Sequence, residues 1–211
     1  MRDNDSMARR GDQLREHILF IAKDVFIEYG FERTSMDVIS GRAETSKRSL
    51  YAYFESKEKL FLAVIELVRE LFLLRLKGPA DYSDTPTEAV TLFCGRYLEI
   101  LLYRASVQMI RISLAEAERF PEQATQYFDQ LFTQIQDRLA DYLKVTFRLS
   151  AAVSAEKAQR LLGLLLYPRL PRAIFGVDPL ARDFDREALI PNIDLKPVRK
   201  VVAEVIASVQ K

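Results

Sequence analysis

The sequence predicts an all-α fold of about nine helices, divided into a small N-terminal part and a larger C-terminal part. Apolar residues recur at spacings of three and four along most of the 211 residues, which is the period of an amphipathic helix. Proline and glycine interrupt this pattern between segments, for example at Gly78-Pro79 and Phe120-Pro121. No two segments alternate apolar and polar residues in the way that a pair of strands would.

The composition allows a well-packed core and argues against several kinds of site. Hydrophobic residues make up 49% of the chain, and no apolar run approaches the roughly 20 residues of a membrane-spanning helix. His17 is the only histidine and Cys94 the only cysteine, which disfavours a catalytic triad, a histidine-rich metal site and an intrachain disulfide. The charged N-terminus is unlike a signal peptide. We therefore expect a cytoplasmic protein with no metal, no cofactor and no membrane partner.

The N-terminal part is expected to hold three helices. An apolar stripe predicts the first helix over 13–29, and Gly30 follows as a residue that can end it with a positive φ. The residues before it are polar and charged, and chain termini are usually disordered. The expected divisions of the chain are 1–12 as a mobile arm, 13–59 as the N-terminal domain and 60–211 as the C-terminal domain.

Two short amphipathic helices are expected next, at about 35–42 and 46–52. Ser35 and Ser46, or the threonine before each of them, are suited to cap these helices, because a side-chain hydroxyl accepts a free backbone N–H of the opening turn. Two short helices joined by a tight turn form the helix-turn-helix unit, which sets its second helix in the major groove of DNA.

The run TSMDVISGRAETSKRSLYAYFESKEKL resembles the DNA-binding motif of the TetR family of bacterial transcription regulators. The residues that carry the resemblance are Thr34, Asp37, Val38, Ile39, Ala43, Ser46, Leu50, Tyr51, Tyr53, Phe54, Ser56, Lys57, Glu58 and Leu60. The segment from Leu50 to Leu60 is its most specific part. Glu44 stands where the family usually has a turn glycine, and a positive φ there would strain a glutamate mildly. More loosely, the run from Arg111 to Glu122 resembles the C-terminal domain of an AefR-like subgroup.

The TetR resemblance implies that the outward-facing residues of the second motif helix contact bases and phosphates. Lys47 and Arg48 have the donors that guanine edges and phosphates accept, while Thr34 and Lys57 stand at helix starts that favour phosphate. Net charge adds little, since it is +1 for the whole chain. For Tyr53, core packing is an equal alternative. The expected DNA-binding residues are Thr34, Arg42, Thr45, Ser46, Lys47, Arg48, Ser49, Tyr51, Tyr53 and Lys57.

The C-terminal part is expected to begin within a long helix at 57–76 that both domains share, so that movement in one part reaches the other. Pro86, the break at Phe120-Pro121 and Ser154 mark the starts of later helices. These later helices are expected at 85–104, 106–119, 122–148, from Ser154 onward, and at 197–210.

The last two long helices are expected to form a dimer interface. The leucine run at 161–166 leaves no polar face on its helix, and a helix that is apolar all round is buried on both sides. The TetR resemblance implies that such helices from two subunits form a four-helix interface in a homodimer. The expected interface residues are Leu162, Leu165, Leu166, Val198, Val202, Val205 and Val209.

The resemblance also implies a small-molecule effector bound among the helices of the C-terminal part. Aromatic residues together with a few polar groups would suit an apolar or aromatic ligand. For each residue taken alone, core packing is the more ordinary role of an apolar stripe. The candidate ligand-binding residues are Leu71, Phe93, Tyr97, Leu101, Gln108, Arg111, Tyr127, Leu131 and Tyr167.

The leading functional hypothesis is a homodimeric repressor that binds double-stranded DNA at a pseudo-palindromic operator and is released by its effector. A DNA-binding dimer without an effector and a helical protein-interaction scaffold are the alternatives. An enzyme is disfavoured, because the sequence shows no nucleophile–base pair, metal cluster or glycine-rich phosphate loop.

Overall fold

The computed structural model describes residues 2–183, 185, 188 and 190–207, and within these ranges the chain forms helices and no strand. One isolated bridge pairs Tyr103 with Ala181. The all-α prediction is confirmed. None of the helices in the described part is long and apolar enough to cross a membrane.

The N-terminal helices are α1 (Arg2–Arg33), α2 (Met36–Arg42), α3 (Lys47–Tyr53) and α4 (Lys57–Arg75). The remaining elements are η1 (Pro79–Asp81), α5 (Pro86–Leu101), α6 (Arg104–Ala115), α7 (Pro121–Phe128), η2 (Asp129–Thr133), α8 (Gln134–Thr146), α9 (Ala151–Leu166), α10 (Arg169–Ile174) and α11 (Leu195–Ala207). The structure exceeds the expected nine helices for two reasons. The π-helical turn η2 divides the helix expected at 122–148, and the short α10 follows a cis Tyr167-Pro168 bond.

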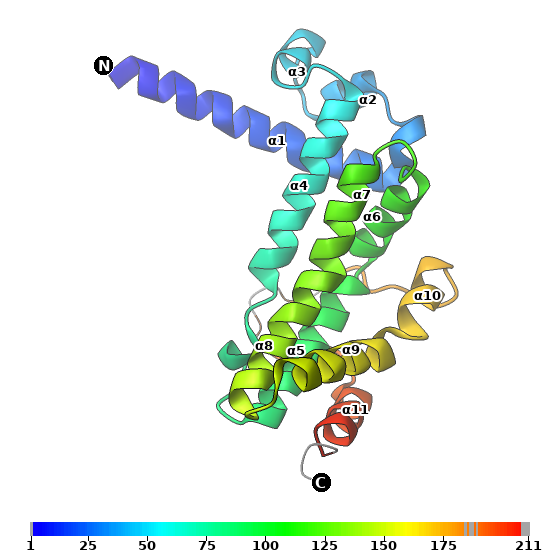
Figure 1. The fold of residues 1–211 in the computed structure, drawn as a ribbon. Coiled ribbons are helices and arrows are strands. Elements are labelled where there is room, and N and C mark those ends of the chain that lie inside the picture. Colours follow the sequence, from blue (N-terminus) through cyan, green and yellow to red (C-terminus); the bar gives the residue numbers. More distant parts are fainter. Residues whose placement is uncertain (1, 184, 186–187, 189, 208–211) are drawn as a thin grey trace.

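Helix α1 differs from the expectation at its start, because it begins at Arg2 rather than at Gln13. Residues 2–12 of the expected mobile arm are therefore helical, and they extend away from the rest of the molecule (Figure 1). Gly11 does not stop the helix, since a glycine inside a helix costs only about 1 kcal/mol. Gly30 has φ 77°, so the helix axis breaks there, as the sequence predicted.

Serine caps fix the starts of α2, α3 and α4. The hydroxyls of Ser35, Ser46 and Ser56 accept backbone N–H groups of the first turns at 3.2, 3.0 and 3.2 Å. Between α2 and α3, Glu44 has φ 50°. The turn therefore demands a positive φ of a glutamate, which is the mild strain expected from the sequence.

Helix α5 is the central helix of the C-terminal part, and its residues from Ala89 to Leu101 are all buried. The close approach of Leu195 at the start of α11 depends on Gly95, because a Cβ at this position would lie 2.5 Å from the leucine side chain. Two charged side chains inside this part pair with each other. Arg96 and Glu99 form an ion pair at 2.5 Å, and Glu99 also accepts the backbone N–H of Asn192.

Two expected boundaries are wrong. Helix α6 ends at Ala115 rather than near 119, and the turn that follows leads to Pro121. Helix α9 begins at Ala151 with Ser150 as its cap, not at Ser154, whose hydroxyl donates to the carbonyl of Ala151. Both serines suit a cap, but Ser150 has the extended backbone of a capping residue and its hydroxyl accepts the N–H of Val153.

The two ends of the molecule are formed by different helices. Helices α2 and α3 lie at one end, beside the middle of α1, whereas α9 and α11 lie at the other (Figure 1). Helix α4 runs from the first end toward the second. The shared helix that the sequence predicted is therefore present, and it links the helix-turn-helix to the large helical part.

We predict that Glu44→Gly is more stable than Glu44→Ala by about 1 kcal/mol, because only glycine relieves the positive φ while both changes remove the carboxylate. The free energy of unfolding of both variants can be measured with urea. Equal stabilities would mean that the turn carries no backbone strain.

Candidate nucleic-acid interface and cavity

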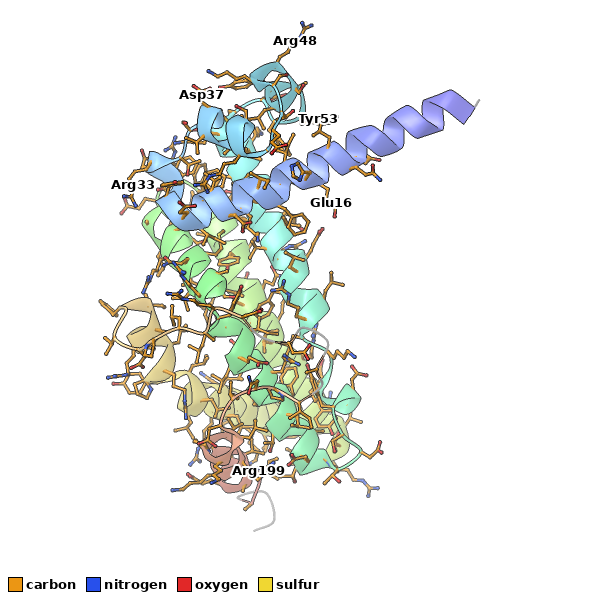
Figure 2. The ribbon with its side chains drawn as sticks, turned by 180° about the vertical axis from the view of Figure 1, so that it is seen from behind. Glu16, Arg33, Asp37, Arg48, Tyr53 and Arg199 are labelled. Atoms are coloured by element: carbon orange, nitrogen blue, oxygen red, sulfur yellow. The ribbon has the colours of Figure 1, made fainter. Side chains whose placement is uncertain are left out.

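Helix α3 presents a basic, exposed face that is anchored from behind. Leu50 and Phe54 are buried in the core, whereas Lys47, Arg48 and Tyr51 are exposed on the opposite side. Arg48 points away from the body of the molecule at the tip of the helix-turn-helix (Figure 2). This alternation places hydrogen-bond donors where a DNA groove could meet them.

An ion pair joins the two helices of the motif. Lys47 Nζ lies 2.5 Å from Asp37 Oδ1, and the hydrogen bond to this carboxylate raises the pKa of Lys47. Lys47 therefore stays charged, although DNA phosphates would compete with Asp37 for it. Next to it, the hydroxyls of Ser46 and Ser49 lie 2.8 Å apart, and Thr45 is half-buried.

Three of the expected DNA-binding residues are engaged within the protein. The buried Thr34 donates its hydroxyl to the carbonyl of Gly30 at 2.7 Å, and Lys57 donates to the carbonyl of Phe31 at 3.0 Å. Arg42 donates to the Glu28 carboxylate and to the Tyr29 hydroxyl. The hydrogen bonds from Arg42 and then from Tyr29 lower the pKa of Glu28 to about 2.

These contacts hold α1, α2 and α4 together, which is a structural role. Tyr53 behaves in a similar way, because it is half-buried against the core. Its hydroxyl lies close to α1, since a Cβ on Gly11 would be 3.4 Å from it. The packing alternative stated for Tyr53 is thus the one that its surroundings favour.

An aromatic cluster forms the joint between the helix-turn-helix and the C-terminal part. Phe26 and Phe31 come from α1, Phe61 from α4, and Phe120 from the turn before α7. The ring of Phe31 lies 4.9 Å from Phe61 and 5.6 Å from Phe120, between ring centroids. Such pairs add about 0.5–1.5 kcal/mol each to the burial of the rings themselves.

Arg119 closes this joint from the outside. Its guanidinium donates to Glu32 at 3.0 Å and to Glu58 at 2.7 Å, and it stacks 4.7 Å above the Phe31 ring. We call this set of contacts the Arg119 clasp. Sequence reasoning missed it and selected Arg111 in the same run. The only sequence feature that could have indicated the clasp is the position of Arg119 next to the predicted break at Phe120-Pro121. Nothing in the sequence pattern indicated its two acidic partners.

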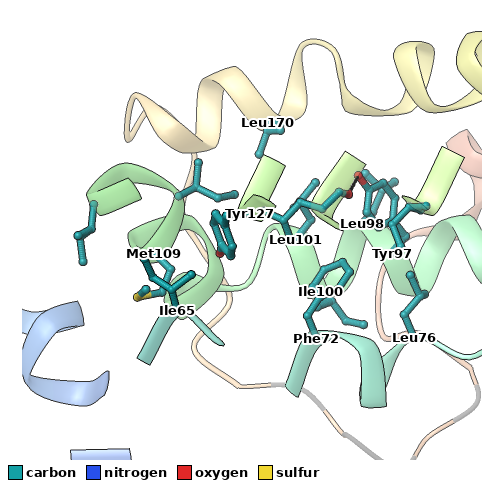
Figure 3. Packing of buried hydrophobic residues seen from close by; sticks show 14 of the residues in the cluster. Ile65, Phe72, Leu76, Tyr97, Leu98, Ile100, Leu101, Met109, Tyr127 and Leu170 are labelled. Atoms are coloured by element: carbon teal, nitrogen blue, oxygen red, sulfur yellow. Dashed lines mark hydrogen bonds between the residues drawn. The ribbon is translucent and has the colours of Figure 1, made fainter. Parts of the chain in front are cut away.

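A cavity of about 840 Å³ lies where α1, α4, α6 and α7 meet. Four candidate ligand-binding residues line it: Leu71, Gln108, Tyr127 and Leu131. The other lining residues are Lys23, Asp24, Ile27, Glu28, Tyr29, Gly30, Arg33, Val68, Phe72, Arg75, Ile100, Tyr103, Arg104, Ala105, Ser106, Met109, Ile112 and Arg182. Figure 3 shows Tyr127 beside Met109 in this region. Helix α1 contributes to the wall, which the sequence did not predict.

The other candidate ligand-binding residues lie elsewhere. Phe93, Tyr97 and Leu101 are fully buried, and Tyr97 donates to the carbonyl of Leu131 at 2.8 Å. Burial raises the pKa of Tyr97 strongly, so the phenol stays neutral. Arg111 donates to the carbonyls of Ile174 and Ala173, which ties α6 to α10, and Tyr167 is 73% exposed away from the cavity.

Most of the expected interface residues are buried within one chain. Leu162, Leu165, Val198, Val202 and Val205 pack in the core of the C-terminal part, and Leu166 is half-buried. Val209 lies outside the described residues. The five buried side chains face the core of their own chain and leave little surface for a second subunit, whereas part of Leu166 stays accessible. The prediction selected the apolar stripe of each helix, and this is the side that packs against the core of the same chain.

The exposed apolar residues of α9 are Val153 and Leu164, and Tyr167 follows the helix. They lie on the side of α9 that the rest of the chain leaves uncovered. No sequence pattern separated Leu164 from the buried leucines on either side of it.

Fold and site define a class of protein: a helix-turn-helix unit at one end of a large helical part that encloses a cavity. The family model for bacterial regulatory proteins of the tetR family matches residues 18–64, and the model for the C-terminal domain of AefR-like transcriptional repressors matches 88–190. The chain belongs to the TetR family of bacterial regulatory proteins.

The curated relatives match over only part of the chain. The chain is 40% identical to the transcriptional repressor NicS of Pseudomonas putida over 65 residues, which is 31% of each protein. It is 38% identical to the regulator RutR of Escherichia coli over 86 residues, 41% of this chain and 40% of RutR. The matched segments thus span less than half the length of these relatives.

Two solved structures cover nearly the whole chain. The flavonoid-responsive regulator FrrA superposes with a TM-score of 0.67 at 26% identity, over 94% of this chain and 95% of FrrA. A TetR regulator from Agrobacterium tumefaciens superposes with a TM-score of 0.70 over 93% and 94%, but at 18% identity it shows the fold alone.

We predict that Arg119→Gln loosens the joint without unfolding the protein. The lost clasp is worth about 1 kcal/mol, because its ion pairs are exposed and its stacking is partly solvated. Amide hydrogen exchange of residues 31–34 and 56–60 should therefore become about fivefold faster. Arg160→Gln removes the same charge and an exposed contact to Glu204, and it serves as the control. Unchanged exchange in Arg119→Gln would contradict the clasp.

Proposed function

We propose that this protein is a dimeric transcriptional repressor that binds a pseudo-palindromic DNA operator and is released by a small apolar or aromatic effector. The observation that carries the proposal is the exposed basic face of α3, set on a buried anchor at the end of the molecule opposite α9 and α11. Repression is supported by the match to the AefR-like repressor domain. Since bacterial DNA lies in the cytoplasm, the protein would act there.

The DNA contacts are assigned mainly to α3. Arg48 is placed to donate to base edges, where a guanidinium can make two parallel hydrogen bonds to guanine. Lys47, Tyr51 and the hydroxyls at the start of the helix would bind phosphates and set its position. We place the DNA-binding unit at 13–59, with the helical residues before it as an extension along the duplex.

A second subunit is proposed to dock on the uncovered faces of α9 and α11. On α9 this face carries Val153 and Leu164, with Tyr167 beyond it. Two subunits joined there would hold their α3 helices at the far ends, free to enter successive major grooves about 34–36 Å apart. Operator symmetry would then follow from the symmetry of the dimer.

The cavity is proposed as the effector site, because its walls come from both parts of the chain. Ile27 lies on α1, Leu71 on α4 and Met109 on α6. A ligand between these helices would favour one position of the helix-turn-helix relative to the C-terminal part. The contacts of the Arg119 clasp would lengthen or shorten with that movement. Release from DNA follows if the ligand binds better to the spacing that does not fit the operator.

The effector-free alternative keeps the dimer and the DNA contacts and leaves the cavity without a role. A cavity of about 840 Å³ has the size of a site for a small molecule, which favours the effector. The scaffold alternative gains no support from any particular contact.

We predict that an inverted repeat is enriched from random oligonucleotides by the wild type, and that Lys47→Ala with Arg48→Ala lowers affinity for it at least about tenfold. The double variant should also make the dependence of affinity on salt shallower by about two to four phosphate contacts per dimer. Fluorescence anisotropy at two salt concentrations measures both effects.

Lys144→Ala with Arg148→Ala is the matched control, because it removes the same charge from exposed positions near the end of α8. Equal loss of affinity in both double variants would mean that only net charge matters. Failure to enrich any repeat with a folded dimer would overturn the proposed function.

We predict that Leu164→Arg weakens the dimer at least about tenfold, because the interface would have to bury an unpaired charge. Val145→Arg changes an equally apolar but more exposed side chain on α8, and it should leave the dimer intact. Sedimentation equilibrium distinguishes the two. A fully dimeric Leu164→Arg protein would exclude this face of α9.

A further inference from the structure

We propose that the effector is a small amphipathic acid, whose apolar body lies in the cavity and whose anionic group is bound by Arg104 and Arg182 at its mouth. The inference rests on the proposed function, in which the cavity binds the effector, and it adds the charge of the ligand. Carboxylic acids of this kind are ionised at neutral pH.

The two arginines are brought together by the fold. Tyr103 and Ala181 form the isolated bridge, and the backbone N–H of Arg104 donates to the carbonyl of Ala181 at 2.9 Å. Arg104 and Arg182 directly follow the two bridge residues, both are exposed, and both line the cavity. Two guanidinium groups that are distant in sequence therefore stand at one opening.

The charged residues around the cavity are unbalanced. Its described lining holds five basic and two acidic side chains: Lys23, Arg33, Arg75, Arg104 and Arg182 against Asp24 and Glu28. Both acidic groups already have partners, since Asp24 pairs with Lys23 at 2.7 Å and Glu28 with Arg42. The lining therefore carries more basic than acidic groups, which favours an anion over a cation at the mouth.

The helix that begins at the mouth adds to this field. The first turn of α6, from Arg104 to Ser106, lines the cavity, and the N-terminal end of a helix carries a partial positive charge. The arginine side chains would supply the direct hydrogen bonds, because a guanidinium binds a carboxylate with two parallel N–H donors.

The rest of the wall suits an apolar body. Val68 and Leu71 line it from α4, Ile100 from α5, and Met109 and Ile112 from α6. An uncharged ligand would use these side chains and leave the arginines unused. A small, fully polar anion would use the arginines and leave the apolar wall in contact with water. An amphipathic acid would contact both the apolar wall and the two arginines.

An anion at this place would also act on the joint between the two parts. Arg33 belongs to α1, whereas Arg104 belongs to α6 and Arg182 follows α10. An anionic group attracts both sets of cations, so it favours a particular position of α1 against α6. The charge of the ligand would thus contribute to the shift that releases DNA.

The test uses two fluorescent probes that differ by one anionic group. The probe 8-anilinonaphthalene-1-sulfonate carries a sulfonate, and N-phenyl-1-naphthylamine has the same rings without it. Both are titrated into the full-length protein and into Arg104→Gln with Arg182→Gln. We expect the double variant to bind the sulfonate about tenfold more weakly, because charge-assisted hydrogen bonds are lost, and to bind the neutral probe within about twofold of wild type.

The control is Lys144→Gln with Arg148→Gln, which removes equal charge from exposed positions outside the cavity and should change neither affinity. Unchanged binding of the sulfonate to the Arg104 and Arg182 variant, or an equal loss for both probes, would overturn the inference.

Ser106→Trp separates this inference from the proposed function, because it fills the cavity and leaves both arginines in the chain. Gln108→Trp serves the same purpose if the first variant unfolds. If the tryptophan variant binds neither probe and the arginine variant shows no selective loss of the sulfonate, the cavity remains the proposed effector site. The inference that the effector is an anion is then wrong. Retention of both probes in a folded tryptophan variant would mean that the cavity is not their site, and it would overturn both proposals.

Discussion

The packing of Phe31 is the interaction on which the rest of the structure depends. This ring lies between Phe61 and Phe120, with the Lys57 ammonium 4.3 Å and the Arg119 guanidinium 4.7 Å from its centroid. One residue therefore joins the end of α1, the start of α4 and the turn before α7. Because a packed core shifts between discrete arrangements rather than bending smoothly, a small change in the nearby cavity can become a rotation of the whole helix-turn-helix.

Much of the fold could be predicted because it depends on local patterns. Thr45 or Ser46 before a short apolar stripe predicted the start of α3, where Ser46 is the cap, and Gly30 predicted the break in α1. Where two local signals competed, the prediction failed. Ser150 and Ser154 both suit a cap, and the structure uses Ser150, which follows the positive φ of Arg148 by two residues. The start of α1 shows a different limit, since the polar residues before Gln13 were expected to be disordered as a chain terminus, and residues 2–12 are helical.

The site was harder to predict, because it depends on which face of each helix packs against its own chain. Lys47, Arg48 and Tyr51 were placed on the surface by the motif, and they lie there. Leu165 and Leu164 are neighbours with the same chemistry, yet only the second is exposed. Arg119 and Arg182 owe their surroundings to contacts with distant segments, which hydrophobic periodicity does not record.

The most direct test of the account is the distance between the two α3 helices in solution. Ala52→Cys places a spin label on the exposed side of α3, and the buried native Cys94 should remain unlabelled. Bound to its selected duplex, the dimer should give a narrow distance distribution near about 34–36 Å, and a broader or longer one without DNA. The absence of any intermolecular distance, or a DNA-bound distance far from one helical turn, would contradict a symmetric dimer that reads two major grooves.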